Sequence, residues 1–363
     1  MSARLTLIAL VCASACTHPP KASSVSSAPV SPEAALVAAD RAAYAAFPEA
    51  LGARAKSFIP ASSDGLLGRN ARWGDLYSPR FQMGAGHALR LAVAAGRGDY
   101  ASRAFRAIEI ATQNIRDDGY VVSRLPGDIG VTLSEANIAS GAAFFLGDAC
   151  LGLVALGTQP KSPITVERQA LVRQALVRAN RWLMTQDQAL LSVDRLAPNR
   201  LLLNARAYQA CSLLDSDASL REASQKQAHR FAMLALTLLA DDGHFIEAGG
   251  HDTSYQGVAI MVGQELRLAG YARPALIKAM GRASDWMAQR ISPEGRVDST
   301  GNARTCSGGE TFGGKKKGLD FSALLTAMVY TSVVDKDPQA ARAAASLVDW
   351  YKASKGASPC WPE

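Results

Sequence analysis

Apolar residues recur at helical spacing along almost the whole chain beyond residue 32, and no alternating run of useful length predicts a strand. Each helical run ends near a glycine, a proline or a polar cluster. We therefore expect an all-α fold of about five to six helical hairpins in one domain, residues 33–363. The expected helices cover residues 33–57, 75–96, 98–117, 133–157, 164–187, 200–215, 219–240, 254–270, 272–291, 319–334 and 337–353.

A turn of similar composition follows three of these helices: Asp117-Asp118-Gly119-Tyr120, Asp241-Asp242-Gly243-His244 and Pro293-Glu294-Gly295-Arg296. The last two turns lie about fifty residues apart, the length of one helical hairpin, and the first interval is a little over twice that. Such a period in an all-helical chain predicts an α/α toroid. A helical solenoid that binds a protein partner is the alternative, but its turns need fewer residues. In a toroid, the longer loops should gather at one rim around a cleft: residues 117–132, 241–253 and 292–318.

The N-terminus has the pattern of an export signal, residues 1–15. An apolar run follows Arg4, and small residues directly precede Cys16. Such a cysteine resembles the acylated residue of bacterial lipoproteins, and simple signal-peptidase cleavage after Ala15 is the alternative. Residues 16–32 are rich in Ser, Pro and Ala and predict a flexible tether. We expect an exported protein held in the cell envelope, on the periplasmic side of the outer membrane, by a lipid anchor alone. Without acylation of Cys16 it would be periplasmic or secreted.

Charge and cysteines add to this picture. The formal net charge is +7, and because an exported protein meets no nucleic acid, an anionic polysaccharide or oligosaccharide is the natural partner. The alternative is that the surplus of positive charge only keeps the protein soluble.

Cys150 and Cys211 stand in apolar helical runs and are expected as buried thiols, whereas Cys306 and Cys360 stand in a loop and the tail and could form a bridge. No cysteine or histidine cluster has metal-ligand spacing, so no metal or other cofactor is expected.

The segment from Asp241 to Val258 carries most of the candidate chemistry. It is polar, broken by glycines and flanked by expected helices, so it would place His251 and Tyr255 at or near a helix start. Histidine and tyrosine can transfer a proton near neutral pH without a metal. The alternative is that His251 serves only the helix N-terminus.

The order Asp242-Gly243-His244-Phe245-Ile246, His251, Tyr255-Gln256-Gly257 resembles the catalytic toroid of hyaluronate and chondroitin lyases. The resemblance implies that Asn204 hydrogen-bonds a uronate carboxylate while the C5 proton is removed. It also implies that His251 or Tyr255 takes that proton, that Tyr255 returns it to the leaving oxygen, and that Arg304 assists. The family's Trp-rich stretch and β-sandwich domains are absent, and so is the Asn-Asn-His signature of the alginate lyases. A lone toroid of alginate-lyase size is the closer comparison, with a divergent specificity.

Further polar residues are expected to line the cleft. Arg206 and Tyr208 follow Asn204 at alternate positions of an apolar helix start, although Asn204 could instead cap its helix and Arg206 could lie in a surface ion pair. The remaining expected substrate-binding residues are Glu135, Asn137, Asp252, Gln256 and Lys315.

Within the glycine-rich basic segment Ser307–Gly318, residues Gly309–Lys316 nearly match a phosphate-binding loop but lack the hydroxyl residue after the lysine and follow no strand. We interpret the whole segment as a basic flap beside the cleft, with a plain solvated loop as the alternative. Aromatic side chains that could stack on sugar rings are Trp73, Tyr77, Tyr120 and Phe312, whereas Phe81 is expected in the core.

Two other functions remain open. Glu135 and Asp252 could act as the acid and base of an inverting glycoside hydrolase on the same toroid, which requires a separation of roughly 6.5–9.5 Å. The chain could also be a non-catalytic, glycan-binding envelope lipoprotein. We favour β-elimination of an acidic, uronate-containing glycan, and the sequence does not specify its sugar or linkage.

Overall fold

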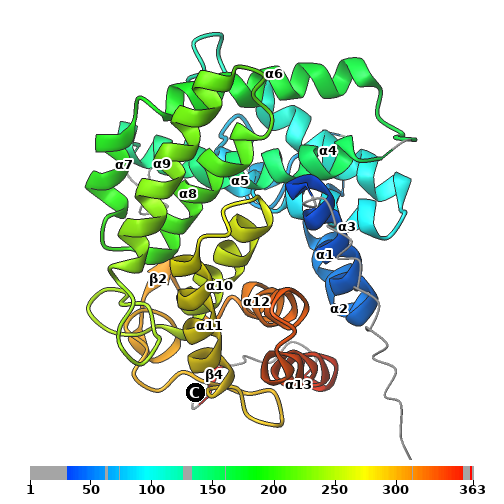
Figure 1. Ribbon diagram of the computed structural model, residues 1–363. Coiled ribbons are helices and arrows are strands. Elements are labelled where there is room, and N and C mark those ends of the chain that lie inside the picture. The colour runs from blue at the N-terminus through cyan, green and yellow to red at the C-terminus, as the bar shows by residue number, and fades with distance from the viewer. Residues whose placement is uncertain are drawn as a thin grey trace, which may run out of the picture. The chain divides into compact units, whose positions relative to one another are not determined.

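The computed structural model describes residues 31–61, 64–72, 74–125, 133–159, 161–312, 314–354 and 360–361 (Figure 1). The expected export signal, with Cys16, lies outside the described residues. From Ser31 onward the chain forms one compact unit. The structure confirms the all-α expectation.

The α-helices are α1 (Pro32–Ala46), α2 (Pro48–Ser57), α3 (Ala85–Ala94), α4 (Gly98–Thr112), α5 (Glu135–Gly157), α6 (Val166–Leu183), α7 (Asp187–Asp194), α8 (Pro198–Ser212), α9 (Ala218–Leu236), α10 (Thr253–Leu268), α11 (Pro274–Ala288), α12 (Phe321–Val334) and α13 (Pro338–Ser354). Short 3₁₀ turns occur at η1 (Asn70–Arg72), η2 (Pro79–Gln82) and η4 (Cys306–Gly308). Four two-residue strands complete the described elements: β1 (Val297–Asp298), β2 (Thr311–Phe312), β3 (Lys315–Lys316) and β4 (Cys360–Trp361).

Several helices differ from the expected boundaries. The expected helix 33–57 is two helices, because Pro48 cannot continue α1 and instead occupies the first position of α2. The expected helix 75–96 contains α3 only, since Gly84 has a φ of +102° and separates η2 from it. Helix α7 was not expected as a separate element.

The helices divide into two sets by their packing. Helices α1, α3, α5, α8, α10 and α12 each pack against the next in this order, and α12 packs against α1. Helices α2, α4, α6, α9, α11 and α13 pack against members of the first set (Figure 1). Helix α5 is the only one in the described ranges that is long and apolar enough to cross a membrane, and its most apolar 18-residue stretch is wholly buried in the fold. That burial is typical of a central core helix.

Charged side chains from the first set of helices meet inside the fold. Arg90 of α3 forms ion pairs with Asp40 of α1 and Glu265 of α10, both at 2.7 Å. Arg206 of α8 also pairs with Glu265, and Tyr330 of α12 hydrogen-bonds Asp40. Burial raises the pKa of Glu265, but Arg206 and Arg90 outweigh it and hold that pKa well below its usual range. These residues come from five helices, so the network links those helices. Each buried charge in it has a partner of opposite sign, so that no ion is buried alone.

The three acidic-glycine turns have one structure. Their glycines have φ values of +86°, +103° and +78°, and a Cβ atom there would lie within 2.5 Å of a main-chain carbonyl oxygen of α6, α11 or α13, respectively. Only glycine allows both the positive φ and the close approach. The glycines, with their carbonyl and tryptophan neighbours, are Gly119 with Arg178 and Trp182, Gly243 with Arg282 and Trp286, and Gly295 with Ser346 and Trp350.

Two disulfides cross-link the fold. Cys306–Cys360 joins the loop before α12 to the tail, which confirms the possible bridge. Cys150–Cys211 joins α5 to α8 across a Cα–Cα distance of 5.1 Å, so the expectation of two free buried thiols was wrong. The reason is that α5 and α8 pack directly against each other and place the two side chains within bonding distance.

Candidate functional site

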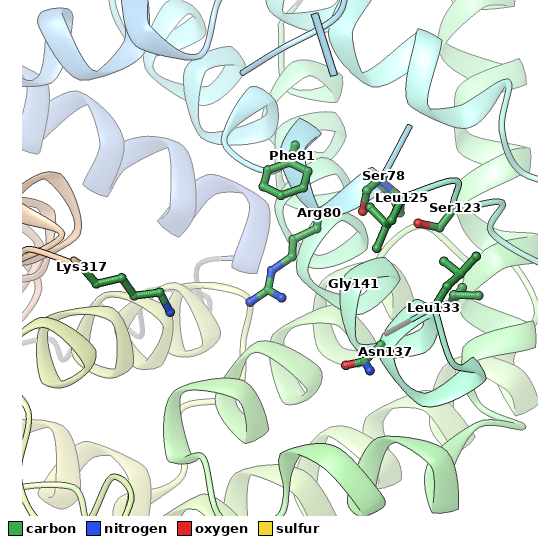
Figure 2. Close-up of a pocket in the computed structure, with 11 residues that line it drawn as sticks. Ser78, Arg80, Phe81, Ser123, Leu125, Leu133, Asn137, Gly141 and Lys317 are labelled. Atoms are coloured by element: carbon green, nitrogen blue, oxygen red, sulfur yellow. The ribbon is translucent and has the colours of Figure 1, made fainter. Parts of the chain in front are cut away.

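A pocket of about 220 Å³ opens where the expected cleft loops meet (Figure 2). Ser123 and Leu125 of the 117–132 loop line it together with Lys317 of the 292–318 loop. The 241–253 loop joins the same region, because the Ala303 amide donates to the His251 carbonyl oxygen at 2.8 Å. The described parts of the three loops therefore gather as expected. The pocket is completed by η2 and the start of α5, through Ser78, Pro79, Arg80, Phe81, Leu133, Asn137, Ile138 and Gly141.

Arg80 is the prominent charged group of this pocket. Figure 2 shows its side chain extending into the open space between Asn137 and Lys317. Its cation lies over the Phe144 ring at 4.7 Å, and no carboxylate of the described residues lies within ion-pair distance. Burial, together with the cations of Arg200 and Arg304, lowers the pKa of Arg80 to about 10. The side chain therefore stays charged at neutral pH and is available to an anionic ligand.

Local backbone pairing fixes Arg80 in this position. Tyr77 and Arg124 exchange two main-chain hydrogen bonds, 2.7 and 2.6 Å long, so the strand-like segment before η2 is held against the 117–125 loop. Pro79 then begins η2, because its fixed φ suits the first position of a helical turn. The result is a short, anchored turn that presents Arg80 to the pocket.

A network of charges surrounds the Tyr255 hydroxyl beside the pocket. The Lys317 ammonium donates to the Tyr255 oxygen at 3.0 Å and to Glu310 at 2.7 Å. The Tyr255 hydroxyl donates to Glu310 at 3.2 Å. The Arg304 guanidinium lies 4.2 Å from the centre of the Tyr255 ring and bonds Glu310 through two nitrogens, at 3.0 and 2.8 Å. Arg304 also pairs with the buried Glu247. The structure thus brings Tyr255 and Arg304 together, as expected.

The network shifts the pKa values of its acids. Burial raises the pKa of Tyr255, while Lys317 and Arg304 act in the opposite direction. Burial would raise the pKa of Glu310 as well, but Arg304 and Lys317 hold it at about 2. Glu247 differs, because burial raises its pKa and Arg304 only partly compensates. The Tyr255 hydroxyl is therefore protonated at neutral pH, and Glu310 is ionised.

Asp252 holds the parts of this network together. It caps α10 by accepting the amides of Ser254 and Tyr255, at 3.1 and 3.2 Å. It also accepts the amides of Arg304 and Thr305, at 3.1 and 2.7 Å, and the Thr305 hydroxyl. The carboxylate is buried and fully occupied by donors. Asp252 therefore positions Tyr255 and Arg304, and the structure does not place it where it could contact a substrate or act as a catalytic base.

His251 lies in a different environment from Tyr255. Its Nε2 is 3.0 Å from the Thr300 carbonyl oxygen, and its ring packs edge-on against His244 and Trp286. The two ring contacts belong to the acidic-glycine turn and to α11, and Thr300 lies in the 292–318 loop. The expected pairing of His251 with Tyr255 is thus not observed, because the loop turns the imidazole toward Trp286 of α11.

Asn204, Arg206 and Tyr208 are buried in α8, which corrects their expected place in the cleft. Asn204 donates to Asp194 at 3.0 Å, and Arg206 belongs to the internal ion-pair network. The Tyr208 hydroxyl donates toward the Leu183 carbonyl oxygen at 2.9 Å. Helix α8 packs against several other helices. Its alternating polar residues are therefore hydrogen-bonding groups inside the fold.

The other expected substrate-binding residues lie in three different environments: the pocket, the protein surface and the core. Asn137 lines the pocket. Glu135 is exposed at the first turn of α5, and Lys315 is exposed on β3. Gln256 is buried and bonds the Gly243 and Ala283 carbonyl oxygens, both at 3.1 Å, so it has a structural role instead.

Among the aromatic candidates, Tyr77 is buried and Tyr120 packs edge-on against Trp182. Phe81 was expected in the core but lines the pocket. Trp73 and the Phe312 side chain lie outside the described residues.

Three functional candidates were missed from the sequence. Lys317 and Glu310 lie in the basic flap, where only their charge marks them. Arg80 follows Pro79 in a segment expected to be helical, and it has no motif around it. Its importance depends on the pocket that distant segments build.

Comparisons with protein family models, curated proteins and solved structures found no match to this chain. In the ranges that the structure describes, no three His, Cys, Asp or Glu side chains gather in a way that could hold a metal ion. The site is therefore interpreted from its own geometry.

Proposed function

We propose that this protein is an exported polysaccharide lyase that cleaves a uronate-containing glycan by β-elimination. The observation that carries the proposal is the Arg80 cation, which has no carboxylate partner among the described residues and lies in a pocket whose Lys317 contacts the Tyr255 hydroxyl. This arrangement combines an anion-binding group with a proton-transferring group, and β-elimination of a uronate requires both.

An α/α toroid is the architecture that we propose for the helical unit. The cyclic packing order from α1 through α12 and back to α1 supports an inner ring. The recurrence of one turn structure at Gly119, Gly243 and Gly295 supports repeated hairpins. In this architecture the pocket would occupy the rim at which the inner helices α5 and α10 begin.

The pocket chemistry favours an acidic sugar. Arg80 would pair with the uronate carboxylate, and Asn137 and Lys317 are the other polar side chains with an amide or ammonium group in the lining. The Phe81 ring offers an apolar surface for a sugar ring. At about 220 Å³ the pocket is smaller than typical ligand sites of roughly 300–1,000 Å³. It would therefore enclose about one sugar residue, with the rest of the chain outside.

In the proposed reaction, the Tyr255 phenolate takes the C5 proton of the bound uronate. The C–H electrons form the C4–C5 double bond, and the C4–O bond breaks with its electrons on the glycosidic oxygen. That oxygen receives the proton from Tyr255, which returns to the phenolate. Arg80 would stabilise the enolate charge on the carboxylate, while Lys317 and Arg304 would stabilise the phenolate. Because burial raises the pKa of Tyr255, only a minor fraction is ionised at neutral pH.

Hydrolysis by an inverting mechanism is the second candidate. The expected pair, Glu135 and Asp252, gives it little support because Asp252 is buried and saturated with donors. Glu247 is the observation in its favour: burial raises its pKa, and its Oε2 is buried without a partner. A protonated Glu247 with an ionised Glu310 would give one acid and one base. A glycan-binding lipoprotein without activity would need Arg80 but not Tyr255.

Export remains part of the proposal. Two disulfides favour an oxidising compartment outside the cytoplasm. Lipid anchoring through Cys16 is tested by Cys16→Ser, which should move the protein from the membrane fraction to the soluble fraction with its fold unchanged. Unchanged membrane retention would contradict the anchor.

The test of function is incubation with a panel of uronate polymers, while the ultraviolet absorbance of an unsaturated product and the release of reducing ends are followed together. A lyase raises both signals in parallel. Reducing ends without absorbance would indicate hydrolysis, and binding without either signal would indicate a non-catalytic role.

A further inference from the structure

The C-terminal tail is attached to both ends of a segment next to the pocket. Strand β4 pairs in parallel with β1, with Val297 opposite Cys360. The Ser299 amide and hydroxyl both donate to the Trp361 carbonyl oxygen, at 2.8 and 3.3 Å. The disulfide then fixes Cys360 to Cys306. The tail therefore restrains residues 297–306 at their start by hydrogen bonds and at their end by a covalent bond.

Cys306 lies within the loop that carries the charged network. The Cys306 amide donates to the Lys317 carbonyl oxygen at 2.9 Å, and the Lys317 amide donates to the Glu310 carbonyl oxygen at 2.7 Å. The Glu310 amide donates to the Arg304 carbonyl oxygen at 2.8 Å. Three main-chain bonds thus align the three charged residues that surround Tyr255. Cys306 is bonded directly to the first member of this series through its amide.

The backbone at Cys306 is unusual. Its φ is +54°, a left-handed value that residues other than glycine rarely adopt. A free chain would relax such a conformation unless its surroundings hold it. The bond to Cys360 is a restraint that acts directly on this residue.

The two disulfides differ in their access to solvent. Cys150 and Cys211 are fully buried between α5 and α8, whereas Cys306 and Cys360 are partly exposed. A dithiol reductant should therefore reach Cys306–Cys360 first. It would supply two electrons and two protons, become a cyclic disulfide, and leave two protein thiols.

We infer that the Cys306–Cys360 disulfide makes the site dependent on oxidation. With these cysteines reduced, the helices keep their fold, but the loop no longer holds Arg304, Glu310 and Lys317 around Tyr255. The site is completed only when the bond forms outside the cytoplasm. The effect on activity rests on the proposed lyase function, whereas the effect on the loop does not.

The experiment uses the mature protein and the double variant Cys306→Ser/Cys360→Ser, which leaves no free thiol from this pair. Hydrogen–deuterium exchange is followed over residues 299–318 and over α3 and α5. The variant should exchange about tenfold or more faster in 299–318, with α3 and α5 unchanged. Equal exchange in 299–318 would overturn the inference, and so would faster exchange throughout the helices, because the bond would then stabilise the whole fold.

The second measurement is turnover of a uronate polymer by the same two proteins and by parent protein treated with dithiothreitol. Loss of about tenfold or more of the turnover, restored when the reductant is removed in air, is expected. Full activity of the variant would refute the dependence on oxidation. If the parent forms no product from any polymer, the proposed function fails, and exchange in residues 299–318 decides the inference about the loop.

Discussion

Replacing Arg80 by methionine separates the binding role of this residue from any role in stability. Methionine fills a similar volume and removes only the charge and its hydrogen-bond donors. No carboxylate of the described residues forms an ion pair with Arg80, and the attraction of Asp194 only partly offsets the burial of its charge. That charge should therefore destabilise the free protein and favour a bound anion. The variant should therefore be more stable than the parent and bind an acidic glycan less tightly.

The structure sets the size of the stability change. The pKa of Arg80 falls from its ordinary value of 12.5 to about 10, and at about 1.4 kcal/mol per unit this limits the destabilisation to about 3 kcal/mol. The side chain is partly exposed, so solvent screening reduces that value to about 1–2 kcal/mol. Loss of the Phe144 ring contact offsets about 0.5 kcal/mol. For a unit of this length, the net gain of about 1 kcal/mol raises the Tm by about 1–2 °C.

Differential scanning fluorimetry without ligand measures the stability, and calorimetric titration with a uronate oligosaccharide measures the binding. Loss of a charge-assisted pair should weaken binding by about tenfold or more. Arg97→Met is the matched control, because Arg97 is exposed and paired with Asp99. It should change neither quantity. An Arg80→Met protein with a lower Tm and unchanged affinity would refute the reasoning and make Arg80 a structural residue.

Four further predictions concern catalysis and stability. Tyr255→Phe removes only a hydroxyl, so turnover of a uronate polymer should fall by about 10²-fold or more with little change in Tm; full activity would exclude Tyr255 from the chemistry. Because burial raises the pKa of Tyr255 and the phenolate is the reactive form, turnover by the parent should rise by about tenfold per pH unit near neutrality; a pH-independent rate would contradict this. Cys150→Ser/Cys211→Ser opens a cross-link spanning 61 residues and should cost about 4 kcal/mol in a urea titration. Arg206→Met leaves one carboxylate oxygen of Glu265 without its buried partner and should cost about 3–5 kcal/mol by the same titration, whereas a surface ion pair would cost under about 1 kcal/mol.

The helical fold could be predicted because its signal is local. Apolar spacing located nearly every helix, and the acidic-glycine turns at Gly119, Gly243 and Gly295 require a positive φ that the sequence itself reveals. The division at Pro48 also has a local cause, since proline cannot continue α1, but the apolar spacing runs on through it and by itself predicts one helix. Local sequence patterns therefore identify the helices and turns, but they do not show which helices pack against each other.

The site was harder to predict, since its residues come together only through packing. Tyr255 and Arg304 lie about fifty positions apart, and the helix start at Tyr255 marked one of them. Asn204 and Arg206 looked like cleft residues because polar groups in an apolar helix either face solvent or pair internally, and sequence does not distinguish the two. No pattern in the sequence around Arg80 predicts its role. That role depends on the pocket, where no carboxylate of the described residues forms an ion pair with it.

The mass of the product released from a uronate polymer tests the central proposal most directly. β-Elimination adds no water across the broken bond, so each new non-reducing end carries an unsaturated uronate that is lighter by one water than the hydrolysis product. The proposed mechanism predicts this lighter product from the parent protein and its loss in Tyr255→Phe. A saturated product of full hydrated mass, formed equally by Tyr255→Phe and lost on substitution of Glu247, would contradict it.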